Sequence, residues 1–298
     1  MTGYVESLTD PSYSGQILVF TYPLIGNYGV SDKSTWESEK IHATGVVVSE
    51  ASEVFARWLD SQGVPFITSV DTRALTKYLR SRGTMLGAIT NHGSWNMKQN
   101  FKTPFVSIPK PILYNTQYKQ TIILVDCGMK MNILRELMKL NFMIKRVPMS
   151  YDYSNEDFAG VVLSNGPGDP ADYTETIRVT RNVYRQNKPM MGICLGSQIM
   201  GLAAGAKTYK LKFGHRGHNQ PVQMDDGKCF VTSQNHGYAV DEKKLPKDWY
   251  VNFRNLNDNS VEGVAHKTKP FFSVQFHPEA CPGPTDTRWL FKKFHELL

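Results

Sequence analysis

The pattern around Cys194 is typical of a cysteine that carries chemistry. Cys194 follows the short apolar segment 190–193, which predicts a strand, and precedes residues 198–204, which predict a helix. Glycines at 192 and 196 flank it and permit the strained strand-to-helix turn that lifts a nucleophile off a sheet. The N-terminus of the following helix stabilises a thiolate and leaves backbone N–H groups free for an oxyanion. A lone cysteine is by default a buried structural residue, and the two glycines favour a nucleophile instead.

A thiolate nucleophile needs a base, and the base needs an acceptor that orients it. His277 directly follows the predicted strand 271–275, so it lies at the same edge of the sheet as Cys194 if the two strands are parallel. Glu279, two residues further on, can turn back toward the imidazole. Taken alone, these residues are explained more simply by a surface turn around Pro278. The His277–Glu279 pattern indicates a catalytic pair only when it is considered together with Cys194.

Two further segments at predicted strand ends have the composition of binding loops. Residues 164–170 read SNGPGDP, and their glycines allow backbone N–H groups to approach a ligand closely. They lack the GxGxxG spacing of a dinucleotide site, and an ordinary turn is the alternative. Residues 234–238 read QNHGY and offer amide and imidazole groups. We prefer His277 to His236 as the base because His277 has a carboxylate beside it.

The second half of the chain alternates regularly between strand and helix patterns. The continuous apolar segment 121–126 predicts a strand that is buried on both faces. The same reasoning places further strands at 142–149, 158–164, 190–193, 230–234, 249–253, 263–266 and 271–276, and helices at 132–140, 173–186 and 287–298. This alternation predicts an open, mostly parallel sheet with helices on both faces, whose ligands bind beyond the carboxyl ends of the strands.

The first half predicts a smaller α/β domain. Its apolar runs predict strands at 17–23 and 43–49, and its i, i+3, i+4 spacings predict helices at 52–62 and 71–80. Residues 100–119 contain three prolines and little periodicity, which is typical of a linker. We therefore expect a first domain at 1–100, a linker at 101–119 and a second domain at 120–298.

Composition excludes several classes of protein. The chain has 298 residues, 41% of them hydrophobic, which is enough for two domains. We expect a cytoplasmic protein, because no apolar run reaches the roughly 18 residues of a membrane span and the first residues do not resemble a signal peptide. The net charge of +7 is spread over scattered lysines and arginines, which indicates a solvated surface rather than a nucleic-acid site. Four cysteines at 127, 194, 229 and 281 show neither CxxC pairs nor zinc-ligand spacing, so we expect no disulfide and no metal.

The motifs together resemble the class I (triad) glutamine amidotransferases. The matching segments are SNGPGDP (164–170), GICLGSQ (192–198), TSQNHGYAV (232–240) and SVQFHPEACPGPTD (273–286). Outside these motifs the chain is similar to the glutaminase subunits of carbamoyl-phosphate synthetases. That similarity rests on LTDPSYSGQILVFTYPLIGNYGV (8–30), VDTRALTKYLRSRG (70–83), DCGMKMNILREL (126–137) and GAKTYKLKFGHRGHNQPV (205–222).

The resemblance implies a mechanism. Cys194 attacks the side-chain amide of glutamine, His277 protonates the departing ammonia and later activates water, and Glu279 stabilises the imidazolium. Backbone N–H groups of Leu195 and Gly168 hold the oxyanion. Glutamine recognition falls to residues matched to family positions: Ser12, Gly166, Gly168, Leu195, Gln198, Asn235, Gly237 and Tyr238.

The resemblance also implies a partner. Ammonia would pass to a large synthetase subunit that makes carbamoyl phosphate from bicarbonate and ATP, for arginine or pyrimidine biosynthesis. We expect no cofactor in this chain, which has no GxxxxGK[ST] motif, and we expect ATP and a divalent metal on the partner. Two alternatives stay open: an amidotransferase serving GMP or anthranilate synthesis, and a catalytically weak, regulatory or scaffolding subunit.

Three departures from the family pattern accompany the resemblance. Relatives usually carry a further segment before the MTGY that opens this chain, so we expect a fragment or a mis-assigned start. The predicted linker is short for the family. Ser197 stands where many relatives carry histidine, one turn past the nucleophile, where we expect it to be tolerated.

Overall fold

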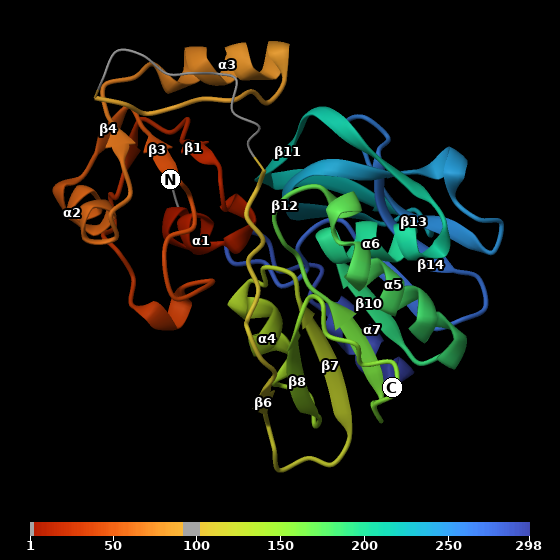
Figure 1. Ribbon diagram of the computed structural model, residues 1–298. Coiled ribbons are helices and arrows are strands. Elements are labelled where there is room, and N and C mark those ends of the chain that lie inside the picture. Colours follow the sequence, from red (N-terminus) through yellow and green to blue (C-terminus); the bar gives the residue numbers. More distant parts are fainter. Residues whose placement is uncertain (1–2, 92–101) are drawn as a thin grey trace.

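The first half of the chain folds around a small parallel sheet. The computed structural model describes residues 3–91 and 102–298, so residue 101 of the predicted linker and residues 1–2 and 92–100 of the predicted first domain lie outside the described residues. Strands β1 (Ile17–Val19), β3 (Gly45–Val47) and β5 (Phe66–Ile67) pair in parallel in the order β1-β3-β5. Strands β2 (Leu24–Ile25) and β4 (Glu50–Ala51) form a second parallel pair. Figure 1 shows these elements gathered on one side of the molecule, in red and orange.

Three helices accompany this sheet: α1 (Tyr4–Thr9), α2 (Glu53–Ser61) and α3 (Thr72–Arg82). The two predicted helices are confirmed as α2 and α3, and both begin at a capping side chain. Ser52 Oγ accepts a hydrogen bond from the Phe55 N–H, and the Asp71 carboxylate accepts one from the Ala74 N–H at 2.9 Å. Such bonds satisfy N–H groups that the helix itself leaves free. Helix α2 buries Phe55 and Leu59 in a core that includes Val46.

A ten-stranded sheet organises the second half, in the order β12-β11-β13-β14-β15-β10-β9-β7-β8-β6. The five central strands are parallel, as predicted: β15 (Phe271–Val274), β10 (Met190–Ile193), β9 (Gly160–Leu163), β7 (Thr121–Asp126) and β8 (Met143–Pro148). The flanking strands pair antiparallel: β6 (Ile112–Tyr114), β11 (Lys207–Met224), β12 (Cys229–Asp241), β13 (Trp249–Asn255) and β14 (Val261–His266). The sheet is therefore mixed, and the prediction of a mostly parallel sheet holds only for its centre.

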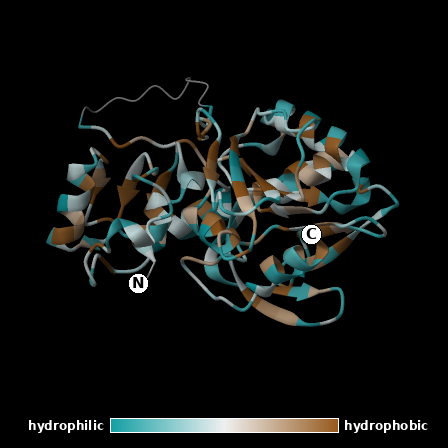
Figure 2. Cartoon of the chain, turned by 90° about the horizontal axis from the view of Figure 1, so that it is seen from below, coloured by the Kyte–Doolittle hydropathy of each residue, from teal (hydrophilic) through white to brown (hydrophobic). Residues whose placement is uncertain are grey.

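Helices cover both faces of this sheet, as predicted. Helices α4 (Met131–Leu137) and α7 (Trp289–Leu297) pack on one face, and α5 (Thr174–Val183) and α6 (Leu195–Ala204) pack on the other. Alternate residues of β7 point into the two cores, which explains why this strand is apolar at nearly every position. Figure 2 shows the hydrophobic residues concentrated on the inner strands and the hydrophilic ones on the outer surfaces.

The sequence reasoning missed two strands of the large sheet, β6 and β11, and in the first half it missed the short strands β2, β4 and β5 and helix α1. Strand β6 lies inside the segment expected as a linker and pairs with β8 at the edge of the large sheet. Strand β11 runs through the basic stretch that follows α6, where charged and half-buried residues alternate without an apolar signal. Within the described residues, no helix is long and apolar enough to cross a membrane.

Candidate active site

Cys194 occupies a sharp turn between β10 and α6. Its backbone has φ 53° and ψ −104°, a conformation that costs an L-residue about 1–3 kcal/mol and is typical of functional sites. The flanking glycines are required by packing. A Cβ at Gly196 would lie 2.2 Å from the Leu163 carbonyl oxygen, and one at Gly192 would lie 2.6 Å from the Gly196 carbonyl oxygen. The turn forms only because both positions lack side chains.

The thiol of Cys194 is almost fully buried, at 2% exposure. The amide Nε2 of Gln275 donates to the sulfur at 3.6 Å, and the sulfur lies 3.7 Å from the Asn235 carbonyl oxygen. Gln275 is held in turn by Gln198, whose Nε2 donates to the Gln275 Oε1 at 3.0 Å. The sequence reasoning did not select Gln275, although it stands two residues before His277.

His277 and Glu279 lie together at the same edge of the sheet as Cys194. Strands β10 and β15 are parallel with Ile193 opposite Val274, so their carboxyl ends coincide. The Nδ1 of His277 lies 2.7 Å from the Oε1 of Glu279, within hydrogen-bond distance. The Nε2 of His277 makes no hydrogen bond within the described residues.

His277 and Glu279 shift each other's pKa. Burial lowers the pKa of His277, but the charges of Glu279 and Cys194 outweigh it and raise that pKa to about 10. Burial raises the pKa of Glu279, but the charges of Lys130 and His277 lower it to about 2. These charges favour an imidazolium at His277 beside an ionised carboxylate at Glu279. The Nε2–H of that imidazolium is then free to donate to the reacting group.

Lys130 supports this carboxylate from helix α4's N-terminal side. Its Nζ lies 3.1 Å from the Glu279 Oε1 and donates to the Ala280 carbonyl at 2.5 Å. The Asn132 side chain also donates to the Glu279 carbonyl. The sequence reasoning did not identify Lys130 or Asn132, because they lie about 150 residues from the carboxylate in the chain.

The two halves of the chain meet at this network. Glu37, from the first half, accepts hydrogen bonds from the Asn132 N–H at 3.0 Å and from Arg135 at 3.3 Å. Asn165 donates to the Ser12 Oγ at 2.8 Å and accepts from the Lys130 N–H at 2.9 Å. The SNGPGDP segment, which follows β9 as predicted, thereby holds Ser12 in place.

A cavity of about 470 Å³ opens above Cys194. All of the predicted binding residues line it: Ser12, Gly166, Gly168, Leu195, Gln198, Asn235, Gly237 and Tyr238. The predicted base and its acceptor, His277 and Glu279, are buried and are not among the residues that line the cavity. Residues 234–238, expected as a loop after a strand, lie within β12 instead. The structure thus brings together side chains from strand ends, from β12 and from the first half of the chain.

Sequence profiles of two families match the two halves of the chain. The profile of the carbamoyl-phosphate synthase small chain, CPSase domain, matches residues 1–89. The profile of glutamine amidotransferase class-I matches residues 123–297. The carbamoyl phosphate synthase small chain of Caldanaerobacter subterraneus is 44% identical over 319 residues, covering 100% of this chain and 87% of that one.

The chain belongs to the carbamoyl phosphate synthase small-chain family. The arginine-specific small chain of Neurospora crassa is 43% identical, and the match covers 99% of this chain and 72% of that one. The multifunctional protein CAD of Squalus acanthias is 46% identical over 323 residues. This small chain spans only 14% of the length of that relative, and 14% to 19% of the first multifunctional relatives.

A solved structure supports the fold of the amidotransferase half. A GMP synthase subunit from Thermoplasma acidophilum has a TM-score of 0.54 and 26% identity, covering 60% of this small chain and 94% of that protein. That share of the chain is close to the part, residues 123–297, that the amidotransferase profile matches. The prediction of a small-chain domain followed by a class I amidotransferase domain is confirmed.

Ser197, which we expected to be tolerated, has a local role in packing. Its Oγ lies 2.8 Å from the Ser273 Oγ, and both hydroxyls are buried between α6 and β15. A hydrogen bond between the two hydroxyls satisfies both groups inside the protein. Ser197 does not line the cavity above the cysteine.

Proposed function

We propose that this chain hydrolyses L-glutamine to glutamate and ammonia and delivers the ammonia to a carbamoyl phosphate synthetase partner. One observation carries the proposal: Cys194 sits on a strained turn at the floor of a cavity, with His277 and Glu279 at the adjacent strand end. A nucleophile, a base and an orienting carboxylate in this arrangement suit acyl transfer from an amide.

The first half-reaction would acylate the cysteine. The Cys194 thiolate attacks the side-chain amide carbon, forming a C–S bond and a tetrahedral oxyanion. His277 gives its Nε2 proton to the amide nitrogen, the C–N bond breaks, and ammonia leaves. A γ-glutamyl thioester remains on the sulfur. The unpartnered Nε2 of His277 is the group suited to this proton transfer.

The second half-reaction would restore the enzyme. His277, now neutral, takes a proton from water while the water oxygen attacks the thioester carbonyl. The C–S bond breaks, glutamate leaves, and the proton remains on His277 beside the thiolate. Glu279 keeps its charge throughout and stabilises the imidazolium in each half-reaction.

Backbone amides support the oxyanion in this proposal. Leu195 is the first residue of helix α6, so its N–H has no partner within the helix. Gly168 has φ 89°, a left-handed conformation that glycine adopts freely. Both residues line the cavity beside Cys194, which is the place an oxyanion would occupy.

The cavity also suits a zwitterionic amino acid. Its lining carries cationic side chains and anionic ones at once: Lys102, Lys210, Arg216, Asp169 and Asp172. The Asn235 side-chain Nδ2 is buried and has no hydrogen-bond partner in the described part of the chain. An unsatisfied buried donor beside the cavity is stabilised when a ligand oxygen accepts from it. Ser12 brings a residue of the first half to the same cavity.

The assignment to a synthetase complex rests on the first half of the chain. Its match to the small-chain CPSase domain distinguishes this chain from amidotransferases of other pathways. We propose a large synthetase chain as the partner, with ATP and its divalent metal bound there, and arginine or pyrimidine biosynthesis as the destination. A cytoplasmic location fits the four free cysteines, since reduced thiols persist in a reducing compartment.

Glutamate release by the purified chain, alone and with its synthetase chain, tests the proposal. The Cys194→Ala variant should lose hydrolysis while it retains glutamine binding by calorimetry, because the sulfur reacts and the cavity wall binds. Cys229→Ala, at an exposed cysteine that begins β12 and does not line the cavity, is the matched control and should keep full activity. Full hydrolysis by Cys194→Ala would exclude the mechanism, and a folded, glutamine-binding but inactive wild type would favour a regulatory subunit.

A further inference from the structure

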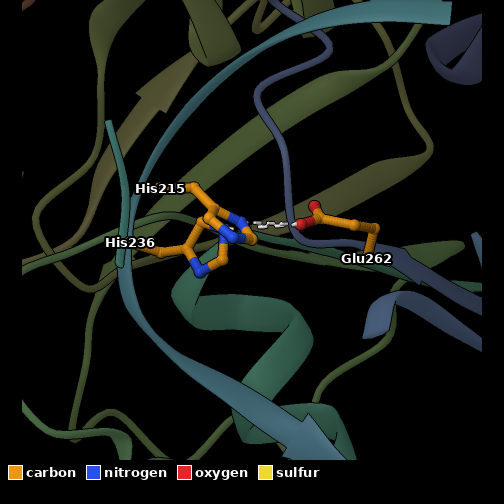
Figure 3. A group of neighbouring side chains, drawn as sticks. All are labelled: His215, His236 and Glu262. Atoms are coloured by element: carbon orange, nitrogen blue, oxygen red, sulfur yellow. Dashed lines mark hydrogen bonds and ion pairs between the residues drawn. The ribbon is translucent and has the colours of Figure 1, made fainter. Parts of the chain in front are cut away.

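Three buried side chains from separate strands converge beside the cavity, and one of them, His236, is among the residues that line it. His215 comes from β11, His236 from β12 and Glu262 from β14, and each is less than one-tenth exposed. One ligand atom from each lies within 4.8 Å of the others. Figure 3 shows the two rings side by side with the carboxylate directed at them. None of the three takes part in the proposed hydrolysis.

The outer nitrogen of each ring faces an acceptor. The Nε2 of His215 lies 2.9 Å from the Asp258 Oδ2, and the Nδ1 of His236 lies 2.9 Å from the Tyr238 carbonyl oxygen. A carbonyl oxygen or an ionised carboxylate can only accept, so each outer nitrogen carries the proton. A histidine whose outer N–H is held by a carboxylate or a backbone carbonyl has its inner nitrogen fixed as a lone pair, the arrangement found in metal-ligating histidines.

The inner nitrogens face further acceptors. The His215 Nδ1 lies 3.1 Å and the His236 Nε2 lies 3.6 Å from the same Glu262 Oε1. The His236 Nε2 also lies 3.2 Å from the Gln234 Oε1. Asn255 supplies one side-chain amide to this group, 3.3 Å from both His215 Nδ1 and Glu262 Oε1. The second carboxylate oxygen, Glu262 Oε2, is buried without a hydrogen-bond partner in the described residues. Hydrogen-bond acceptors outnumber donors in this cluster, and a bound cation would offset the excess of acceptors.

We propose that His215, His236 and Glu262 bind a divalent transition metal of the zinc class. Two nitrogen, or nitrogen and oxygen, ligands about 2.1 Å from a tetrahedral zinc lie about 3.4 Å apart. The 3.1 Å and 3.6 Å separations from Glu262 Oε1 bracket that value. Two imidazoles and one carboxylate form a donor set that suits zinc, and Gln234 Oε1 or water completes four-coordination.

The position of the site indicates what the metal does. His236 lines the proposed glutamine cavity together with its neighbours Asn235 and Gly237, and the Asn235 carbonyl lies 3.7 Å from the Cys194 sulfur. A metal bound to His236 would fix this part of β12 against β11 and β14. It is therefore a structural site that positions the cavity wall, and it takes no part in bond breaking. The inference is independent of the proposed hydrolysis.

Sequence spacing gave no indication of this site, because its ligands stand 21 and 26 residues apart (236 − 215 and 262 − 236). The competing description of the cluster is a protonated His215 held between Glu262 and Asp258. In that state both nitrogens of the ring donate and no metal is needed. The two descriptions differ in metal content, which can be measured.

The test uses the full chain with Cys194→Ala, so that the buried thiolate is not a competing ligand. Chelator-treated protein is titrated with Zn²⁺ by calorimetry and with Co²⁺ by absorption spectroscopy. We expect one equivalent of either ion, with tetrahedral cobalt bands and no thiolate charge-transfer band. His215→Gln and Glu262→Gln should weaken binding by more than about tenfold, and Asp258→Asn by about 10- to 100-fold.

His266→Gln is the matched control, because His266 also pairs with a carboxylate, Asp248 at 3.0 Å, outside the cluster. It should bind zinc as the parent does. Absence of stoichiometric binding, equal binding by His215→Gln, or thiolate bands in the cobalt spectrum would overturn the proposal. The cobalt spectrum of the parent decides the question even where a cluster variant fails to fold.

Discussion

The Nζ of Lys130 and the Oε1 of Glu279 form an ion pair of 3.1 Å in which both side chains are nearly inaccessible to solvent. The same carboxylate oxygen bonds to His277 at 2.7 Å. A residue at the start of α4 therefore fixes the orienting member of the triad. Breaking a buried pair is costly, because the remaining charge is left without a partner.

Replacement of Lys130 by methionine should cost about 3–5 kcal/mol of unfolding free energy, since it leaves the Glu279 carboxylate uncompensated. Urea unfolding at neutral pH measures the loss. Lys139→Met is the control, because Lys139 pairs with Glu136 at 2.7 Å with its own side chain largely exposed. An exposed pair contributes about 1 kcal/mol or less. Equal losses in the two variants would show that Lys130 is not part of a buried charge network.

Replacement of Glu279 by glutamine should lower the turnover number by about 10²- to 10⁴-fold, because the imidazolium loses its stabilising charge. Glutamate release at saturating glutamine measures it. The glutamine-binding constant should change little, since Glu279 does not line the cavity. A rise in the dissociation constant for glutamine with an unchanged turnover number would assign Glu279 to substrate binding instead.

His277 and Glu279 should make the free energy of unfolding depend on pH. The pKa of His277 is raised from 6.5 to about 10, so its contribution is complete below about pH 6.5 and is lost as pH rises through 10. The pKa of Glu279 is lowered from 4.5 to about 2, so its contribution is complete above about pH 4.5 and is lost as pH falls through 2. The difference in unfolding free energy between the wild type and Glu279→Gln should therefore be largest between pH 4.5 and 6.5. A difference independent of pH would contradict this assignment.

The fold was predictable where local pattern decides it. The periodicity of apolar residues and the capping side chains predict helices α2 and α3. The continuous apolar run predicts strand β7. Strand β11 was not predictable, because its partners β12 and β13 lie further along the chain and its own residues are mostly polar, without an apolar pattern. The short edge strand β6 is stabilised by pairing with β8 and has little pattern of its own.

The site was predictable where chemistry requires a particular residue beside a particular backbone. The turn at Cys194 requires the glycines on either side of it, and the imidazole of His277 requires a carboxylate that orients it. The groups that support them are different. Only folding brings Lys130 to Glu279, Gln275 to Cys194 and Glu37 to the backbone of Asn132. A lysine, glutamine or glutamate is ordinarily a surface residue, so its residue type does not predict such a contact.

Glu37 should make stability fall as pH rises from about 4.5 to 7. Burial raises its pKa from 4.5 to about 7, partly offset by the charge of Lys130, so the folded state binds a proton that the unfolded state has released. This contribution is present below pH 4.5 and is lost as pH rises through 7. Glu37→Gln keeps the shape of the side chain and should flatten that part of the curve. An unchanged slope in the variant would rule Glu37 out as its source.

Gly196→Ala should destabilise the chain by about 1–3 kcal/mol or prevent folding, because the added Cβ would lie 2.2 Å from the Leu163 carbonyl oxygen. Thermal unfolding of the soluble variant measures the change. Gly87→Ala is the matched control, since its Cβ would meet only the Ile17 side chain at an ordinary 3.8 Å. Equal stability in both variants would show that the turn at Cys194 tolerates a side chain at 196.

Mass analysis of protein quenched in acid during glutamine turnover tests the central claim most directly. We expect one γ-glutamyl group, found by peptide mapping on Cys194, that disappears when glutamine is exhausted and never forms in Cys194→Ala. Ammonia release at an undiminished rate by Cys194→Ala, or a glutamyl group on any other residue, would contradict it.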